Sequence, residues 1–267
     1  MAERMNPLDR VLVITPTYNE AENIEPIITR LKQAVPTAQV LIVDDNSPDG
    51  TGAIADRLAA TDPSIHVLHR PGKGGLAAAY LAGFEWGLLY GFDVLIQMDA
   101  DGSHQPEVIY DMLAAMRRQG ADMVKGSRWI KGGSTTQSKS RELLSRSANL
   151  WIQLVMDLPV RDSTGGFNAF RAPILRAIDL SNVASKGYTF QVDITRRVLE
   201  AGGKVVEVPI HFPDREAGVS KMSGSIIGEA LMRTTEWGID KRRTQLKGVG
   251  AAVKRQYAKV KDIAKRS

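Results

Sequence analysis

The sequence predicts an α/β fold: a mainly parallel open sheet flanked by helices, with an amphipathic helical part near the C-terminal end. Short runs rich in Val, Ile and Leu alternate with amphipathic segments. A strand that is apolar along its whole length is buried on both faces, and helices between such strands indicate parallel crossover connections. The chain has 267 residues, of which 43% are hydrophobic, so it can bury the core of one large domain.

These patterns predict the elements in chain order. The expected strands occupy residues 11–15, 39–45, 65–69, 93–99, 122–126 and 205–210. The expected helices occupy residues 20–35, 51–61, 75–90, 106–119, 140–158, 188–201 and 226–239. Ligands of open α/β folds bind beyond the carboxyl ends of the strands. We therefore expect the site at the polar loops 16–20, 44–50 and 99–105.

Charge divides the chain into a domain at 1–240 and a basic tail at 241–267. The tail has ten Lys or Arg against the single acid Asp262, so its charge of +9 leaves −4 for the rest of a chain with net charge +5. Such a tail suits anionic lipid headgroups or nucleic acid phosphates, and a merely solvated terminus explains it equally well. The acidic remainder argues against a nucleic acid partner.

Composition also limits the cellular setting. The sequence lacks cysteine, which excludes disulfides and thiolate zinc sites. Its first ten residues contain no apolar core of a signal peptide, and no stretch approaches the roughly 20 apolar residues that span a bilayer. We expect a cytoplasmic protein that can lie on a membrane without crossing it.

The strongest chemical signal is Asp99-Ala100-Asp101, directly after the apolar run at 94–98. Residues two apart at the end of an extended strand point to the same side, so both carboxylates can reach one hard cation, Mg²⁺ or Mn²⁺. A cation there would bridge the diphosphate of a nucleotide sugar. The alternative is that Asp101 caps the next helix and Asp99 is a turn residue.

Two further loops place polar groups beside the same edge. PTYNE at 16–20 and VDDNSPDGT at 43–51 bring Tyr18, Glu20 and Asp45 there. A tyrosine face can stack on a base, and a carboxylate can accept hydrogen bonds from a base or a ribose. Lys73, among the glycines of RPGKGGL, is a candidate for contact with phosphate. The run at 47–50 is explained as well by ordinary turn chemistry.

Seven motifs in this order give a specific resemblance. They are PTYNE, VDDNSPDGT, GKGGL, MDADGSHQPE, KGSRWIKGG, DSTGGF and REAGVSKMS. Together they resemble the polyprenol (dolichol) phosphate mannose synthases, inverting enzymes of glycosyltransferase family 2 with the Rossmann-like GT-A fold. The similarity covers residues 10–240 and is of the bacterial type without transmembrane helices. It implies transfer of mannose from GDP-mannose to a polyprenyl monophosphate at the inner face of the cell membrane.

The resemblance also implies roles for single residues. The nucleotide sugar and its metal would be held by Pro16, Tyr18, Glu20, Asp45, Lys73, Asp99, Ala100 and Asp101, with Arg215 and Lys221 closing onto the diphosphate. The acceptor phosphate would be held by Arg128, Arg141 and Ser145. Some family members have Gln as a further metal ligand where this sequence has Ser103, so the third ligand stays undecided.

Asp162, in DSTGGF, is expected among the catalytic residues with Asp99, Asp101 and Arg128. A phosphate acceptor is already ionised near neutral pH, so no general base is needed. We expect Asp162 to orient the sugar or the acceptor arginines, and a helix cap or a buried salt bridge is an equally good explanation.

Membrane contact is expected from the segment at 143–158. Its apolar residues at 144, 148, 151 and 155 recur at helical spacing, and such a stripe faces either a core or a membrane interface. A second candidate surface is formed by Ile226, Ile227, Ala230, Leu231 and Trp237. A separate membrane protein partner is compatible with this resemblance. The alternative function is transfer of a glucose-type sugar from UDP to a lipid phosphate or a polysaccharide.

Overall fold

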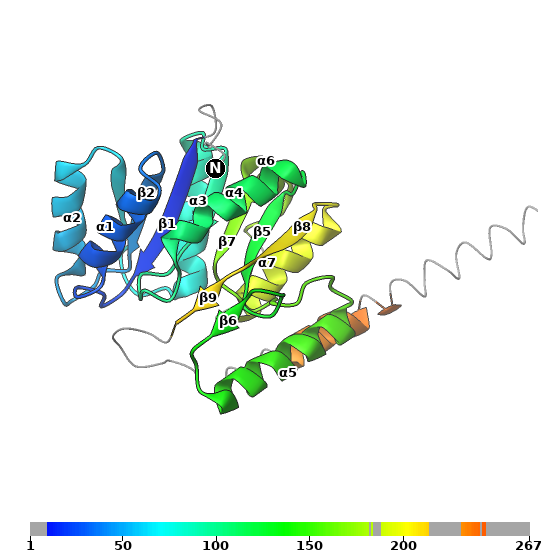
Figure 1. Ribbon diagram of the computed structural model, residues 1–267. Coiled ribbons are helices and arrows are strands. Elements are labelled where there is room, and N and C mark those ends of the chain that lie inside the picture. Colours follow the sequence, from blue (N-terminus) through cyan, green and yellow to red (C-terminus); the bar gives the residue numbers. More distant parts are fainter. Residues whose placement is uncertain (1–9, 182, 184–187, 214–230, 241, 244–267) are drawn as a thin grey trace, which may run out of the picture.

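A seven-stranded sheet forms the centre of the computed structural model, which describes residues 10–181, 183, 188–213, 231–240 and 242–243 (Figure 1). The strands are β1 (Val11–Thr17), β2 (Gln39–Asp44), β3 (Ile65–His69), β4 (Val94–Gln97), β5 (Met123–Ser127), β7 (Asn168–Arg171) and β8 (Val205–Pro209), in the spatial order β3-β2-β1-β4-β7-β5-β8. Only β7 runs antiparallel to its neighbours in this sheet. The prediction of a mainly parallel sheet is confirmed.

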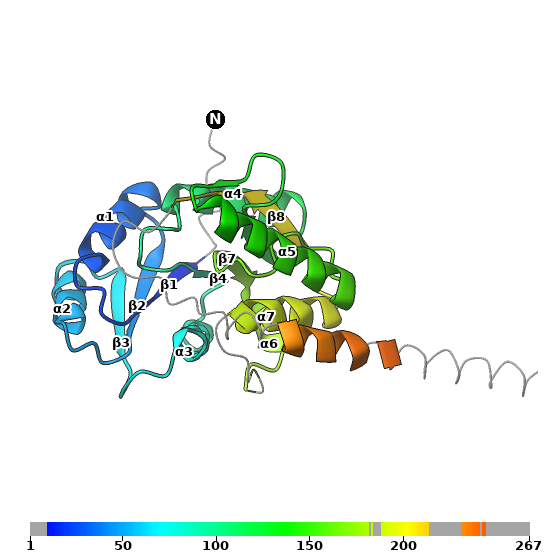
Figure 2. The ribbon, with the colours of Figure 1, turned by 90° about the horizontal axis from the view of Figure 1, so that it is seen from below.

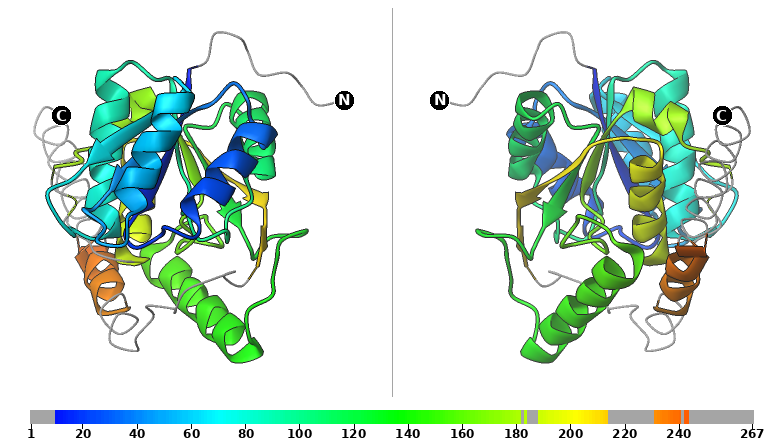
Figure 3. Two further views of the ribbon diagram at one scale, coloured as in Figure 1. Left: turned by 90° about the vertical axis from the view of Figure 1, so that its left-hand side faces the viewer. Right: turned by 90° about the vertical axis from the view of Figure 1, so that its right-hand side faces the viewer.

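Helices cover both faces of the sheet (Figure 3). One face carries α1 (Ile24–Ala34), α2 (Thr51–Thr61) and α4 (Ile109–Arg118), which follows the short 3-10 helix η1 (Pro106–Val108). The other face carries α3 (Leu76–Leu89), α6 (Ala172–Ala177) and α7 (Tyr188–Glu200). Because each face packs its own apolar cluster, the strands are buried on both sides, as their continuous apolar runs predict.

Strand β7 was not predicted, and it shapes the site. Its antiparallel direction places its first residue, Asn168, opposite Gln97 at the end of β4 and opposite Lys125 in β5. The loop that precedes β7 therefore reaches the edge where the parallel strands have their carboxyl ends. This edge gathers DSTGGF together with the loops that follow β1, β2, β3 and β4.

Helix α5 (Lys139–Met156) lies across the carboxyl edge of the sheet (Figures 1 and 2). Its buried face consists of Asn149, Ile152 and Met156. The core-facing explanation of the stripe at 144, 148, 151 and 155 is therefore wrong for two of its four residues, since Leu144 and Trp151 are 43% and 45% exposed. Inward-facing Asn149 rotates the helix away from the orientation that hydrophobicity alone predicts.

A helical segment at residues 231–240 packs beside α5. Gly238 permits this contact, because a Cβ atom there would lie 2.5 Å from the main-chain oxygen of Val155. The Trp151 indole also donates a hydrogen bond to the Thr235 hydroxyl at 3.3 Å. A two-stranded sheet of β6 (Ser134–Thr135) and β9 (His211–Phe212) lies nearby.

Among the described helices, none combines the length and apolarity needed to span a bilayer. The predicted helix at 226–239 is described only from residue 231 onward, where it is helical. Residues 226, 227 and 230 of the second candidate surface, and the basic tail apart from residues 242 and 243, lie outside the described residues.

Candidate functional site

The loops after β1, β2 and β3 meet on the side of the site where the nucleotide is predicted to bind. The Lys73 ammonium nitrogen lies 4.2 Å from the centre of the Tyr18 ring, a cation–π contact between two residues predicted to share this site. Asp45 accepts hydrogen bonds from Arg70 Nη1 at 2.5 Å and from the Gly74 N–H at 2.9 Å. Asp45 therefore anchors the loop that carries Lys73, a contact that sequence reasoning did not foresee.

Glu20 and Pro16 complete this side. The Glu20 carboxylate accepts a hydrogen bond from Asn23 Nδ2 at 2.8 Å, and its main-chain N–H donates to the Thr51 hydroxyl at 3.0 Å. Pro16 lies in β1 opposite Val43. The structure thus brings all the predicted nucleoside residues to one edge, and their contacts with a nucleoside stay predictions.

The paired aspartates follow β4. The Tyr80 hydroxyl donates to Asp99 Oδ1 at 2.6 Å, and Ser103 donates its N–H at 3.1 Å and its hydroxyl at 2.5 Å to Asp101 Oδ1. Burial raises the pKa of Tyr80 well above its ordinary value, and the charges of both aspartates raise it further. Tyr80 therefore stays protonated and remains a hydrogen-bond donor to Asp99.

These two carboxylates fit a divalent cation that is completed by phosphate and water. No group of three or more His, Cys, Asp or Glu side chains is placed to hold a metal within the described part of the chain. Mg²⁺ is commonly bound by one or two carboxylates together with substrate phosphates. The alternative that Asp101 caps the next helix is wrong, because Gln105 is the N-cap residue there.

Three neighbours of the aspartates differ in character. Ser103 is 1% exposed and donates its hydroxyl to Asp101, so it orients this carboxylate, and its role as a ligand stays a prediction. Ala100, which stands between Asp99 and Asp101 in the sequence, is 3% exposed and belongs to the apolar core. His104 Nδ1 accepts a hydrogen bond from the Asp99 N–H at 2.9 Å, which ties together the two ends of the loop at 99–104.

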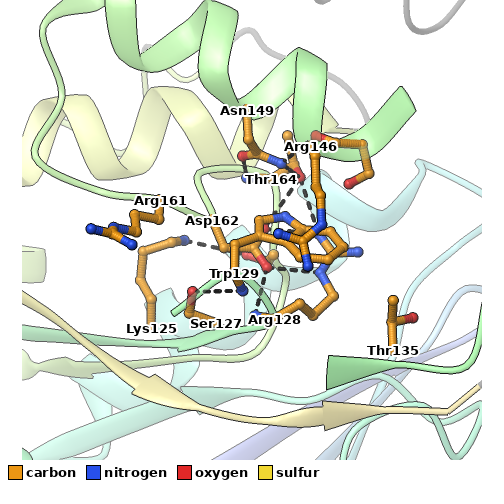
Figure 4. Close-up of polar contacts among 12 residues, drawn as sticks. Lys125, Ser127, Arg128, Trp129, Thr135, Arg146, Asn149, Arg161, Asp162 and Thr164 are labelled. Atoms are coloured by element: carbon orange, nitrogen blue, oxygen red, sulfur yellow. Dashed lines mark hydrogen bonds and ion pairs between the residues drawn. The ribbon is translucent and has the colours of Figure 1, made fainter. Parts of the chain in front are cut away.

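Arg128 and Asp162 form a buried ion pair at the end of β5 (Figure 4). Arg128 donates from Nε at 2.7 Å and from its main-chain N–H at 3.0 Å to Oδ2, and from Nη2 at 2.8 Å to Oδ1. Burial raises the pKa of Asp162, but the charge and hydrogen bonds of Arg128 outweigh it and leave the pKa below its ordinary value. Asp162 is thus a poor proton acceptor. It forms a buried salt bridge and orients Arg128, so two of the explanations given for it in the sequence analysis apply together.

Behind this pair lies a chain of buried polar side chains. Lys125 donates to Asn168 Oδ1 at 2.8 Å, and Asn168 Nδ2 donates to Gln97 Oε1 at 2.8 Å and to Gln191 Oε1 at 2.9 Å. Burial lowers the pKa of Lys125 from 10.5 to about 8, while Asp162 and Glu207 oppose the shift. This chain links three neighbouring strands beneath the loop that carries DSTGGF.

Helix α5 lies over the Arg128–Asp162 pair, on the side where the acceptor phosphate is predicted to bind (Figure 4). Asn149 exchanges hydrogen bonds with Thr164, donating from Nδ2 at 3.0 Å and accepting the Thr164 N–H at 3.2 Å. The Thr164 hydroxyl also accepts from Arg128 Nη2 at 3.2 Å. Ser145 lies one helical turn from Asn149, so it faces the same region.

The remaining predicted residues are less tightly placed. Arg141 is exposed one further turn from Ser145, toward the start of α5. Arg215 and Lys221, which the resemblance assigns to the diphosphate, lie outside the described residues. Sequence reasoning missed Tyr80, Arg70 and Thr164, whose partners are distant in sequence. Only Arg70 had a usable signal, because it precedes the glycine-rich loop of Lys73.

Comparisons with known proteins show the family of the chain. A family model described as glycosyl transferase family 2 matches residues 12–179. Polyprenol monophosphomannose synthase from Mycolicibacterium smegmatis is 51% identical over 247 residues, covering 92% of this chain and 93% of that protein. Undecaprenyl-phosphate mannosyltransferase from Micrococcus luteus is 53% identical over 234 residues, covering 87% and 96%.

A solved structure supports the fold. Glucosyl-3-phosphoglycerate synthase from Mycobacterium tuberculosis, in complex with Mn²⁺, UDP and phosphoglyceric acid, aligns with a TM-score of 0.61 at 16% identity, covering 88% of this chain and 78% of that one. At this identity the likeness concerns the fold alone. The family model and the two mannosyltransferase relatives decide the family: the chain belongs to glycosyl transferase family 2.

Proposed function

We propose that the protein transfers mannose from GDP-mannose to a polyprenyl monophosphate, giving polyprenyl phosphate mannose and GDP. The proposal rests on the names of its mannosyltransferase relatives and on one geometric observation. A Cβ atom on Gly165 would lie 3.4 Å from Asp162 Oδ1, and one on Gly166 would lie 3.9 Å from Asp99 Oδ2. Gly165 and Gly166 thus lie between Asp162, the partner of Arg128, and Asp99, one of the two carboxylates of the proposed cation site.

In the proposed reaction, an oxygen of the acceptor phosphate attacks the anomeric carbon of mannose. The new carbon–oxygen bond forms as the bond to the GDP oxygen breaks, and the electron pair leaves with GDP. Attack from the opposite face inverts the configuration from α to β. The acceptor oxygen is already ionised, so no proton has to be removed, in agreement with the depressed pKa of Asp162.

The chain's own residues position both substrates. Asp99 and Asp101 would hold Mg²⁺ or Mn²⁺, which neutralises charge on the departing diphosphate. Tyr80 and Ser103 fix the two carboxylates, and Arg128 meets the acceptor phosphate with the planar fork that suits phosphate oxygens. Arg141, Ser145, Arg215 and Lys221 keep the roles that the resemblance implies.

The lipid acceptor requires contact with a membrane, and α5 offers a surface for it. Leu143, Leu150 and Leu154 are 70%, 56% and 63% exposed and recur on one side of the helix. Leu144 and Trp151 extend this apolar face. A helix that lies in the interface would let the phosphate enter the site while the prenyl chain stays in lipid. We place this contact at the inner face of the cell membrane, with or without a separate membrane protein.

The direct test is sugar transfer by the purified chain in vesicles that contain polyprenyl phosphate and Mg²⁺. GDP-mannose is the expected donor, and UDP-glucose and UDP-galactose are offered in parallel. Asp99→Asn and Asp101→Asn should each lower kcat/KM by at least about a hundredfold, because the cation site loses a charged ligand. Asp111→Asn, an exposed acid on α4, is the matched control and should retain activity.

The outcomes separate the parts of the proposal. Absence of transfer across several prenol lengths would overturn the reaction. Faster transfer from a UDP sugar would replace the donor. Full activity of the folded double variant of Asp99 and Asp101 would refute the proposed cation site.

A further inference from the structure

Arg146 contacts the Trp129 ring, which also contacts Arg128, the arginine proposed to bind the acceptor phosphate. The guanidinium carbons of Arg128 and Arg146 lie 4.9 and 4.4 Å from the centre of the Trp129 ring. The two carbons are therefore at most 9.3 Å apart, a separation that one phosphate group can bridge with a hydrogen bond to each side. Arg146 comes from α5 and points toward the loop that carries Thr164 (Figure 4).

Charge balance calls for a second cation beside Arg128. A phosphate monoester carries about −1.5 to −2 charges near neutral pH. Asp162 already offsets the charge of Arg128, since it accepts hydrogen bonds from two nitrogens of the guanidinium. Arg141, the other predicted phosphate-binding arginine, is exposed near the start of α5, so a cation closer to Arg128 would compensate more of the charge of the acceptor.

Arg146 is available for this role because its present partner is partly solvated. Arg146 Nε donates to Glu142 Oε1 at 2.8 Å, one turn back on the same helix, and the two side chains are 50% and 32% exposed. An ion pair of this kind contributes little to stability, so a phosphate dianion can compete for the guanidinium. The Trp129 ring already holds the guanidinium on the side of Arg128 while the pair with Glu142 is made.

We propose that Arg146 binds the phosphate of the acceptor together with Arg128, and that Glu142 holds Arg146 until the acceptor arrives. This inference rests on the proposed function, since it deepens the acceptor side of the same site. It gives Glu142 and Arg146 opposite effects: the first competes with the acceptor, and the second binds it. A purely structural ion pair would give both substitutions the same effect.

The experiment measures the KM for a soluble short-chain polyprenyl phosphate, without vesicles, and the KM for the donor. Arg146→Gln should raise the acceptor KM at least about fivefold and leave the donor KM unchanged, because a charge-assisted contact to phosphate is lost. Glu142→Gln should lower the acceptor KM. Arg57→Gln, which breaks a comparably exposed arginine–glutamate pair with Glu25, is the matched control and should change neither.

Arg146 could also bind the phosphate of a bilayer headgroup. Sedimentation with phosphatidylglycerol vesicles that lack polyprenyl phosphate measures headgroup binding separately from acceptor binding. Loss of vesicle binding in Arg146→Gln with an unchanged acceptor KM would overturn the inference in favour of headgroups. A rise of the acceptor KM in both variants would also overturn it. If the wild-type chain transfers mannose and Arg146→Gln has the wild-type acceptor KM, the inference fails alone. If the wild-type chain transfers nothing, the proposed function fails with it.

Discussion

The substitution Asp162→Asn tests the ion pair on which the acceptor side is built. It preserves the size of the side chain and removes the charge. Arg128, whose side chain is only 10% exposed, would then lose its charged partner and two charge-assisted hydrogen bonds. Lys125 would lose a charge that raises its pKa, so this pKa should fall further.

The size of the effect follows from this burial. Removing one partner of a buried ion pair costs about 3–5 kcal/mol, because the other charge stays buried without compensation. For a chain of this length each kcal/mol lowers the melting temperature by roughly 2 °C, so the expected decrease is about 6–10 °C. The acceptor KM should rise at the same time, because the Arg128 guanidinium is no longer held in one orientation.

Calorimetry and steady-state kinetics provide the readouts. Asp193→Asn is the control, because Asp193 is also buried but its partners Arg196 and Arg197 are 22% and 19% exposed and can regain water. It should lower the melting temperature less and leave the acceptor KM unchanged. A melting temperature of Asp162→Asn within about 2 °C of the wild type would show that the pair is not a principal support of this edge.

Two further predictions concern Lys125 and the surface of α5. The folded protein should bind fewer protons than the unfolded chain between about pH 8 and 10.5, because burial lowers the Lys125 pKa to about 8. The free energy of unfolding therefore gains a rising contribution of up to about 3 kcal/mol across this window, and urea titrations of Lys125→Met should lack it; an identical pH profile would contradict the buried charge. Leu154→Asp should weaken binding to vesicles in a sedimentation assay about tenfold and leave transfer to a soluble acceptor intact. The control Leu89→Asp, at a residue 80% exposed on α3, should change neither vesicle binding nor transfer. Equal losses of vesicle binding in the two variants would exclude α5 as the membrane contact.

The parallel part of the fold was predictable because its signal is local. Most of the six parallel strands are apolar runs, and the helices between them show their own periodicity. Strand β7 was missed because its four residues, NAFR, come just after Gly-Gly-Phe and form a strand only by pairing with β4 and β5. Pairing between distant segments leaves no periodic trace in so short a run.

The site was predictable in its loops and less so in its contacts. The position of Asp99 and Asp101 after a buried strand was sufficient to place them at the edge. The burial of Lys125 and Arg128 was not expected from residue type, because charged side chains are rarely buried unless paired. Their partners, Asn168 and Asp162, lie more than thirty positions away. The orientation of α5 was hidden for the same reason, since Asn149 faces inward to meet Thr164.

The reversed direction of β7 has a consequence for how this scaffold can change. The chain leaves the sheet at the end of β5 and re-enters it at the start of β7, and both points lie on one rim. Residues 128–167 therefore form an excursion with adjacent ends, so a graft from another transferase can replace them without altering the order of the seven strands, although β6 and its pairing with β9 would be exchanged as well. The residues of the proposed acceptor site, Arg128, Arg141 and Ser145, all lie in this segment. We therefore expect the exchange to change the acceptor while the loops after β1, β2 and β4 keep their sequence.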